Sequence, residues 1–204
     1  MNKIQIKKCY PYNIIRCLYD MMNIDRSMMP YPSLLYGEYD ITNIKNLIIL
    51  KHLDLDNCGI TSLNGIENLL LIELDLYSNK IKNIEPLRKM KTLEHLDLSH
   101  NKITDFTPLN NLANLKILLL NGIHIIDLKP LSQLSNLKEL HMTLNSKIKD
   151  LSPLMKLKNL QKLHFHNDGK KLYLYKNPLK KQLINLFRSL PNVESNLRDC
   201  LDYL

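Results

Sequence analysis

The stretch LEHLDLSHNKI at residues 93–103 decides the fold of this chain, because its pattern of leucine, asparagine and isoleucine recurs. The first leucine of the pattern stands at positions 71, 93, 115 and 137, so neighbouring copies are 22 residues apart. A fixed period of about 20 to 50 residues is typical of chains in which each copy forms one structural unit and the units stack into a solenoid. We therefore expect the chain from Leu50 to about Asp168 to form such a stack.

Each copy has two halves with different patterns. In the first half, leucines alternate with other residues, which predicts a short strand whose leucines point inward. The second half contains a proline followed by a leucine, and proline suits the first turn of a helix because its φ angle is already fixed there. This half therefore predicts a short helix in each copy, beginning near Pro86, Pro108, Pro130 and Pro153.

An asparagine follows the strand in most copies, and the hydrogen bonds of the backbone explain why this residue recurs there. Backbone N–H and C=O groups that are buried without a partner are costly, and an inward-facing amide can bind those of neighbouring turns. We expect Asn79, Asn101 and Asn145 to form such a ladder, with Cys58 as a substitute in the first full copy. Ile123 occupies the same place in another copy, so we expect the ladder to be weaker there.

These repeats resemble the leucine-rich repeat of the 22-residue type found in phosphatase regulators and internalins, over about residues 31–177. The resemblance implies an α/β repeat fold: a leucine-rich-repeat solenoid with a parallel concave β-sheet, short helical or 3-10 segments on the convex side, and helical N- and C-terminal caps. It also implies that the concave face binds a partner protein, although one fold can carry many kinds of site.

We expect three parts in the 204 residues. Apolar residues at helical spacing over 12–22 predict a helical cap at 1–33. About six repeats follow at 34–176, the first degenerate and the last irregular. Residues 164–175 contain Asp168-Gly169 and predict either a hairpin whose antiparallel strand closes the sheet edge or a truncated repeat. The segment 177–204 is similar to the eukaryotic leucine-rich-repeat cap, with apolar residues at helical spacing at Leu179, Leu183, Leu186, Phe187 and Leu190.

Positive charge is concentrated near the C-terminal end. The formal net charge is +8, and residues 147–181 contain ten Lys and two Asp, a difference of eight that equals the whole excess. Clustered lysines can bind RNA phosphates. This suggests a ribonucleoprotein component, associated with the ribosome or spliceosome, as the alternative function, with contacts at Lys170, Lys171, Lys180 and Lys181. The other explanation is that the lysines lie on different faces and only keep the solenoid solvated.

Composition also bears on where the protein acts. The four Cys include no Cys-x-x-Cys pair and are expected to be reduced thiols. The basic residues Lys3, Lys7 and Lys8 are not followed by an apolar run, because Arg16 and Asp20 interrupt it, and no segment is long enough to span a bilayer. We therefore expect an intracellular protein, cytoplasmic or nuclear, with no membrane association.

The strand periodicity predicts which side chains lie on the concave face. An acidic half, an apolar centre with Ile117 and Leu119, and a basic end with Lys162 follow one another along it. An apolar centre with charged surroundings is typical of protein interfaces. We expect a partner to contact Asp54, Asp56, Glu73, Asp75, Tyr77, Asp97, Ile117, Leu119, His141 and His164. The alternative for the aspartates is that they only keep exposed strands soluble.

The sequence does not favour catalysis or metal binding. His141, His164 and His166 could together bind zinc, but no cysteine or carboxylate joins them by clear spacing, so we predict no metal and no cofactor. Ser99 and Thr143 lack a paired base, and there is no glycine-rich phosphate loop. We therefore predict a non-enzymatic scaffold or adaptor, whose partner by family resemblance is a phosphatase, a motor protein or another subunit of a complex.

Overall fold

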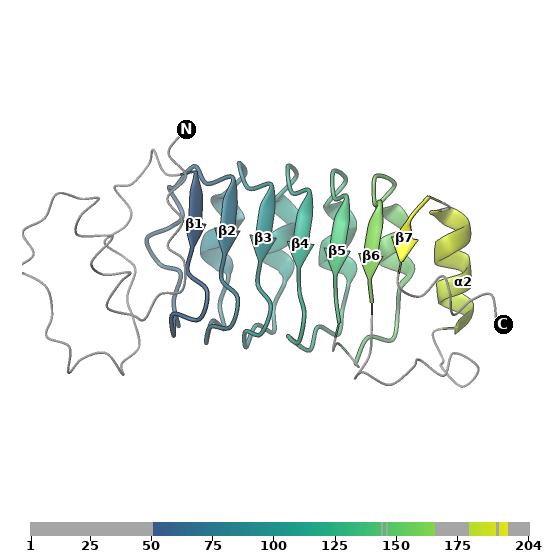
Figure 1. Cartoon of the computed structure of the whole chain (residues 1–204), viewed down its shortest axis with the longest axis horizontal. Coiled ribbons are helices and arrows are strands. Elements are labelled where there is room, and N and C mark those ends of the chain that lie inside the picture. The colour runs from purple at the N-terminus through teal and green to yellow at the C-terminus, as the bar shows by residue number, and fades with distance from the viewer. Residues whose placement is uncertain (1–50, 144, 146, 166–179, 191, 196–204) are drawn as a thin grey trace, which may run out of the picture.

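A computed structural model of the chain describes residues 51–143, 145, 147–165, 180–190 and 192–195. In these residues the repeats form one parallel sheet of seven strands, which lie side by side in chain order (Figure 1). This arrangement confirms the predicted solenoid. The strands are β1 His52–Asp54, β2 Glu73–Asp75, β3 His95–Asp97, β4 Ile117–Leu119, β5 Glu139–His141, β6 Lys162–His164 and β7 Glu194–Ser195.

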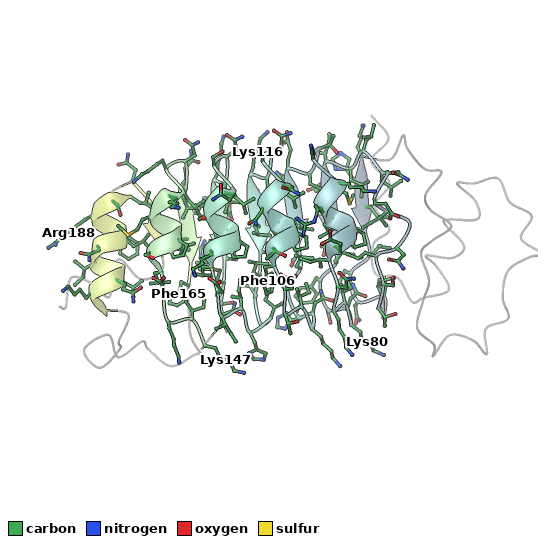
Figure 2. The ribbon with its side chains drawn as sticks, turned by 180° about the vertical axis from the view of Figure 1, so that it is seen from behind. Lys80, Phe106, Lys116, Lys147, Phe165 and Arg188 are labelled. Carbon is green, nitrogen blue, oxygen red and sulfur yellow. The ribbon has the colours of Figure 1, made fainter. Side chains whose placement is uncertain are left out.

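Short 3-10 helices form the other side of the solenoid and are seen in front of the sheet in Figure 2. Each has one of the predicted prolines in its first turn, where the missing N–H of proline costs no hydrogen bond. These helices confirm the predicted convex side. They are η4 Glu85–Lys89, η5 Thr107–Asn111, η6 Lys129–Gln133 and η7 Ser152–Lys156.

The core lies between the sheet and the 3-10 helices and consists mainly of leucine and isoleucine. In every strand from β1 to β5, the central leucine is buried and its two neighbours are partly exposed. Truncating a leucine in such a core to alanine typically costs about 2–5 kcal/mol. The repeated leucines therefore hold each unit against the next, and the first leucines of four copies are 0% exposed: Leu71, Leu93, Leu115 and Leu137.

The predicted asparagine ladder is present in the core. Asn101 Nδ2 donates hydrogen bonds to the carbonyl oxygens of Leu76 (2.8 Å) and Leu98 (3.0 Å). Its Oδ1 accepts a hydrogen bond from the N–H of Ile81 at 3.0 Å. Each asparagine thus joins backbone groups of two successive repeats. The two other predicted members make similar bonds and are also buried: Asn79 and Asn145.

A second series of polar side chains, at the surface, also links the repeats and was not predicted from the sequence. Its members stand just before β3, β4, β5 and β6 and donate to a backbone carbonyl oxygen of the preceding repeat, at 2.7–2.9 Å. Because water can replace these bonds at the surface, we expect each to contribute less than a buried asparagine does. The members are Thr92, Asn114, Asn136 and Asn159.

The two copies without the buried asparagine have a different backbone. Gly59 (φ 68°) and His124 (φ 56°) come directly after Cys58 and Ile123, and both are left-handed. Lys102, the residue equivalent to His124 after an asparagine, does not have a positive φ. The left-handed conformation suits glycine but strains a histidine. The irregular copies therefore have an extra left-handed residue in place of the missing amide.

Replacing His124 by glycine should raise the free energy of unfolding by about 0.5–1 kcal/mol, because glycine adopts the left-handed conformation without strain. Urea denaturation followed by circular dichroism measures the change. Lys102→Gly is the matched control, since its backbone is not left-handed, and it should lower stability. Equal effects of the two substitutions would contradict this account of the irregular copy.

The C-terminal end of the described solenoid is covered by α2, Lys180–Ser189. Its Gln182 side chain accepts a hydrogen bond from the N–H of Leu151 (2.7 Å) and donates one to the carbonyl oxygen of Lys149 (3.0 Å), which ties it to the last repeat. The predicted helical spacing is confirmed for the described part of this segment, where Leu183, Leu186 and Phe187 of α2 are buried and Leu190 is buried just after it. Leu179 lies outside the described residues, and the similarity to the eukaryotic cap stays a prediction.

The edge of the sheet beside β6 is paired by a strand that was not predicted from the sequence. β7 runs parallel to β6 and pairs Lys162 with Glu194 and Leu163 with Ser195. The reason is that α2 acts as one more crossover, which brings the chain back in the same direction as before. The hairpin or truncated repeat predicted over 164–175 stays a prediction, because most of it lies outside the described residues. Residues 166–175, the predicted cap at 1–33 and the degenerate repeat before Leu50 lie outside the described residues.

Candidate partner-binding surface

The outward face of the sheet, which we call the concave face, carries two rows of side chains in the predicted order. Backbone pairing between neighbouring strands sets both rows, and such strands lie about 4.8 Å apart. The first row is His52, Glu73, His95, Ile117, Glu139 and Lys162. The second row is Asp54, Asp75, Asp97, Leu119, His141 and His164.

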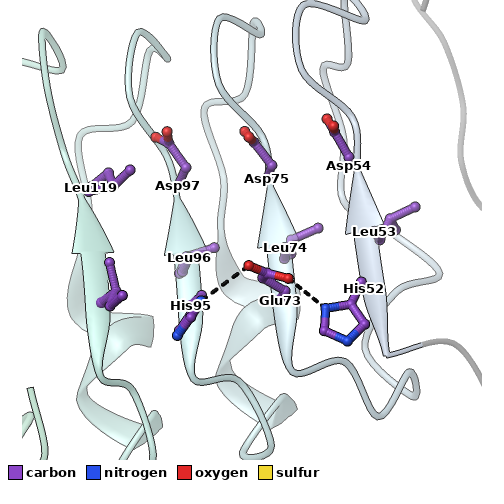
Figure 3. A pocket seen from close by; sticks show the side chains of 11 residues that line it. His52, Leu53, Asp54, Glu73, Leu74, Asp75, His95, Leu96, Asp97 and Leu119 are labelled. Carbon is purple, nitrogen blue, oxygen red and sulfur yellow. Dashed lines mark hydrogen bonds and ion pairs between the residues drawn. The ribbon is translucent and has the colours of Figure 1, made fainter. Parts of the chain in front are cut away.

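A groove of about 260 Å³ lies over β1 to β4 and is lined by residues of both rows. Figure 3 shows Asp54, Asp75 and Asp97 in line at the ends of their strands, with Leu119 next in the same line. Most of the contacts that we predicted from the sequence therefore meet in one groove. Asp56 and Tyr77 lie just beyond the strands, where Tyr77 is 40% exposed and packs edge-on against the His100 ring.

The second-row aspartates are crowded and partly shielded from water. Burial raises the pKa of Asp75 to about 6, against an opposing hydrogen bond from the backbone of Tyr77 and with further upward contributions from Asp97 and Asp54. Burial also raises the pKa of Asp97. Within the described part of the chain, no lysine, arginine or histidine forms an ion pair with the row. The row is therefore an anionic strip without an ion pair of its own, and His100 makes only a smaller electrostatic contribution that lowers the pKa of Asp97.

Glu73, in the first row, differs from the aspartates because histidines balance it. The imidazole Nδ1 atoms of His52 (2.5 Å) and His95 (3.2 Å) lie within hydrogen-bond distance of its two carboxylate oxygens, as the dashed lines in Figure 3 show. The hydrogen bond with His52 is the main cause of the lowered pKa of Glu73. Its carboxylate oxygens thus have partners within the protein, whereas the aspartates of the second row form no ion pair with the described residues.

Neutralising Asp75 should stabilise the folded protein near neutral pH. The pKa of Asp75 is about 6 in the folded protein and 3.8 in the unfolded chain. Asp75 therefore contributes fully to the free energy of unfolding below about pH 4, and this contribution is lost as the pH rises through about 6 and the side chain ionises. Asp75→Asn should therefore raise the free energy of unfolding by about 1 kcal/mol at pH 7, where solvent screens part of the effect, and should leave it unchanged at pH 4. Urea denaturation at both pH values tests this.

Asp105→Asn is the control for that experiment. Hydrogen bonds from Thr107 lower the pKa of Asp105, so neutralising it should not raise stability at either pH. A gain for Asp75→Asn that is as large at pH 4 as at pH 7 would contradict the assigned cause, because protonated aspartic acid and asparagine carry the same charge.

The apolar centre is formed by Ile117 and Leu119, which both point outward from β4 and are partly exposed. The structure places them at the end of the aspartate row and within the same groove. An apolar side chain of a partner could be buried here beside the charged strip, which is the usual arrangement of an interface centre and its rim. The sequence prediction of an acidic half followed by an apolar centre agrees with this geometry.

The basic end lies on β5 and β6. The rings of His141 and His164 are 4.2 Å apart between centroids, and His141 Nε2 lies 2.7 Å from Glu139 Oε1. Lys162 Nζ is 3.5 Å from the other oxygen of Glu139. Our statement that no carboxylate joins the histidines was wrong, because strand alternation places Glu139 on the same face as His141, two residues away. His166 lies outside the described residues.

The described lysines of the 147–181 segment lie on different elements. Lys156 ends η7 on the convex side, Lys162 is on the concave face and Lys181 is on α2. Lys147 lies at the edge of the solenoid shared with Lys80, opposite Lys116 (Figure 2). The described positions thus agree with solvating side chains on several faces. Of the RNA contacts suggested by the sequence, Lys170, Lys171 and the Lys180 side chain lie outside the described residues.

The repeated strand, buried asparagine and proline-led 3-10 helix define a leucine-rich-repeat protein. Two family profiles agree: "Leucine Rich Repeat" matches residues 50–69 and "Leucine Rich repeats (2 copies)" matches residues 70–111. No curated protein matches the sequence. In the described part of the chain, no helix has the length and apolar character needed to cross a bilayer.

Solved structures of Listeria monocytogenes proteins have the same fold. An internalin, inlF, is 24% identical with a TM-score of 0.70, and the match covers 94% of this chain and 59% of that one. Internalin C2 is 26% identical with a TM-score of 0.70, over 95% of this chain and 88% of that one. The functional domain of InlJ is 25% identical with a TM-score of 0.51, over 63% and 28%. The chain thus spans less than two thirds of the first internalin.

Proposed function

We propose that this protein is a non-enzymatic scaffold or adaptor that binds a partner protein on its concave face. The observation that carries the proposal is the groove over β1 to β4, where three aspartates that form no ion pair with the described residues lie beside Ile117 and Leu119. Solenoid repeats commonly present their extended concave surface as a binding site.

The groove favours a partner segment with a particular chemistry. A lysine or arginine of the partner would supply the cation that the row of Asp54, Asp75 and Asp97 lacks, and partial burial strengthens such charge-assisted hydrogen bonds. An apolar side chain next to it would cover Ile117 and Leu119. We therefore propose a basic segment that carries an apolar side chain about two strand spacings, roughly 10 Å, from its cationic group.

The hydroxyl groups on this face support a binding function over catalysis. Ser99 is 1% exposed, and its Oγ accepts a hydrogen bond from the N–H of Asn121 at 3.0 Å. Thr143 Oγ1 donates to the Asn121 side-chain oxygen at 2.8 Å. Both hydroxyls are thus used to hold neighbouring repeats together, whereas a nucleophile needs an adjacent base and open access.

Affinity purification of the tagged full-length protein from its native cells, with and without RNase, tests the proposal. The double variant Asp75→Lys/Leu119→Arg is purified in parallel, together with Ile126→Arg/Asp127→Lys, a control that makes similar changes at exposed residues outside the groove. A stoichiometric protein that survives RNase and is lost only from the groove variant supports the proposal. A partner retained by the groove variant contradicts it, and a ribosomal or spliceosomal set lost on RNase treatment favours the ribonucleoprotein alternative.

A further inference from the structure

Three side chains of the types that bind transition metals converge at the β5–β6 end of the concave face. They are Glu139, His141 and His164, and one ligand atom from each lies within 4.8 Å of those of the other two. All three are partly exposed, so an ion could reach them from solvent. This cluster lies on different strands from the groove over β1 to β4.

The backbone holds these residues in the necessary places. His141 and His164 are register partners on neighbouring parallel strands, so their side chains leave the sheet side by side. Glu139 precedes His141 by two residues and therefore points to the same face. The strands are tied to the repeat core by the buried Leu140 and Leu163, which gives the three ligands a fixed base.

Only a small rearrangement separates this cluster from a metal site. In a tetrahedral zinc site, with metal–ligand distances of about 2.0–2.1 Å, the ligand atoms lie about 3.3 Å from one another. His141 Nε2 and Glu139 Oε1 are already 2.7 Å apart, and no pair needs to change its separation by more than about 1.5 Å, which rotation of partly exposed side chains can supply. Two imidazoles and one carboxylate leave one tetrahedral position open, as in zinc sites with three protein ligands.

We propose that Glu139, His141 and His164 bind one transition-metal ion, with Zn²⁺ as the best fit. Imidazole nitrogen suits Zn²⁺ better than Ca²⁺ or Mg²⁺, which prefer sites made entirely of oxygen ligands. The open position would be filled by water or by a side chain of a bound partner. This inference goes beyond the proposed function and does not depend on it, because metal binding can be measured without the partner.

Lys162 gives the proposal a directional test. Its Nζ lies 3.5 Å from Glu139 Oε2, so the ammonium group competes with an ion for the carboxylate. Removing this positive charge by Lys162→Gln should tighten metal binding severalfold. Substitution of a ligand has the opposite effect, and we expect His141→Gln or His164→Gln to weaken binding at least about tenfold.

The chain also contains a matched control with the same residue types. Glu73 lies between His52 and His95 and binds one ring with each carboxylate oxygen. These two histidines are on strands separated by β2, and among the described residues only Glu139, His141 and His164 bring three such ligand atoms within 4.8 Å of one another. His95→Gln therefore removes an exposed histidine next to a glutamate and should leave metal affinity unchanged.

The experiment uses the full chain, stripped of metal with a chelator and then titrated with ZnCl₂ in a calorimeter. CoCl₂ titration followed by visible absorption reports the coordination geometry, and circular dichroism confirms that each variant is folded. One equivalent of Zn²⁺ bound by the wild type and by His95→Gln, weakened in His141→Gln and His164→Gln and tightened in Lys162→Gln, supports the site. No binding by the wild type, or equal loss in His95→Gln and His164→Gln, overturns it.

Discussion

Replacing Asn101 by alanine will destabilise the folded protein by about 3–5 kcal/mol, the largest effect on stability that we expect from a single polar residue. The side chain bonds the backbone of Ile81, Leu76 and Leu98, and it is only 7% exposed. Its removal leaves several buried backbone groups without partners, and each costs about 1–3 kcal/mol. The loss is measured as a lower urea midpoint at an unchanged slope.

Asn114→Ala is the control for that measurement, because Asn114 also donates a hydrogen bond to the preceding repeat but is exposed. Water can replace its bond to the Lys91 carbonyl oxygen, so the loss should be at most about 1 kcal/mol. If Asn101→Ala and Asn114→Ala lower the free energy of unfolding equally, then burial is not the reason that the asparagines of the core are important. Since stacked repeats are stabilised mainly by their neighbours, Asn101→Ala should also destabilise the adjoining repeats.

Most of the fold could be predicted because the local pattern and its repetition carry the same information. Leucine at every second position predicts a strand, and near-equal spacing places equivalent residues on neighbouring strands, so that His52 pairs with Glu73 and Glu73 with His95. The order of side chains on the concave face followed from this register. The buried asparagines could be predicted because an inward-pointing polar residue needs backbone partners.

The second series of polar side chains, which links the repeats at the surface, was not predicted although its spacing is also regular. Asn114 and Asn136 are 22 residues apart, but Thr92 holds the equivalent place in the preceding repeat, and exposed asparagines are common on any surface. The left-handed conformation of His124 had no sequence signal apart from the unusual Ile123 before it. Such backbone adjustments depend on what the neighbouring repeats can accommodate, which a pattern of residue types does not record.

For the candidate sites too, part of the structure could be predicted from the sequence and part could not. Strand alternation is enough to place Glu139 and His141 on one face, but it does not show that the two side chains approach each other or that the His141 ring lies against His164. Side-chain rotamers depend on packing and charge from three strands at once. The strand β7 was missed for a related reason, because its pairing with β6 follows from where α2 docks and not from any periodicity in residues 194–195.

The double variant Asp75→Lys/Leu119→Arg should weaken partner binding at least about 100-fold while the protein stays folded. Asp75 is the middle residue of the aspartate row, and lysine there opposes a cationic partner group instead of attracting it. Arginine at Leu119 puts a charge where the partner's apolar side chain would be buried, which is a second, independent penalty. Titration calorimetry with the purified partner measures the change in Kd.

The two single variants separate the electrostatic part of that loss from the apolar part. Interactions between exposed charges more than about 8 Å apart are largely screened at physiological ionic strength, and this screening length shortens as salt is added. The effect of Asp75→Lys should therefore shrink as salt increases, whereas that of Leu119→Arg should largely persist. Because residues 75 and 119 are two strands apart, about 9.6 Å, the two losses in binding free energy should add to within a few tenths of a kcal/mol. The exposed control Ile126→Arg/Asp127→Lys should bind like the wild type. A salt-independent effect of Asp75→Lys would argue against a cationic partner segment, and unchanged affinity in the double variant would remove the groove from the binding site altogether.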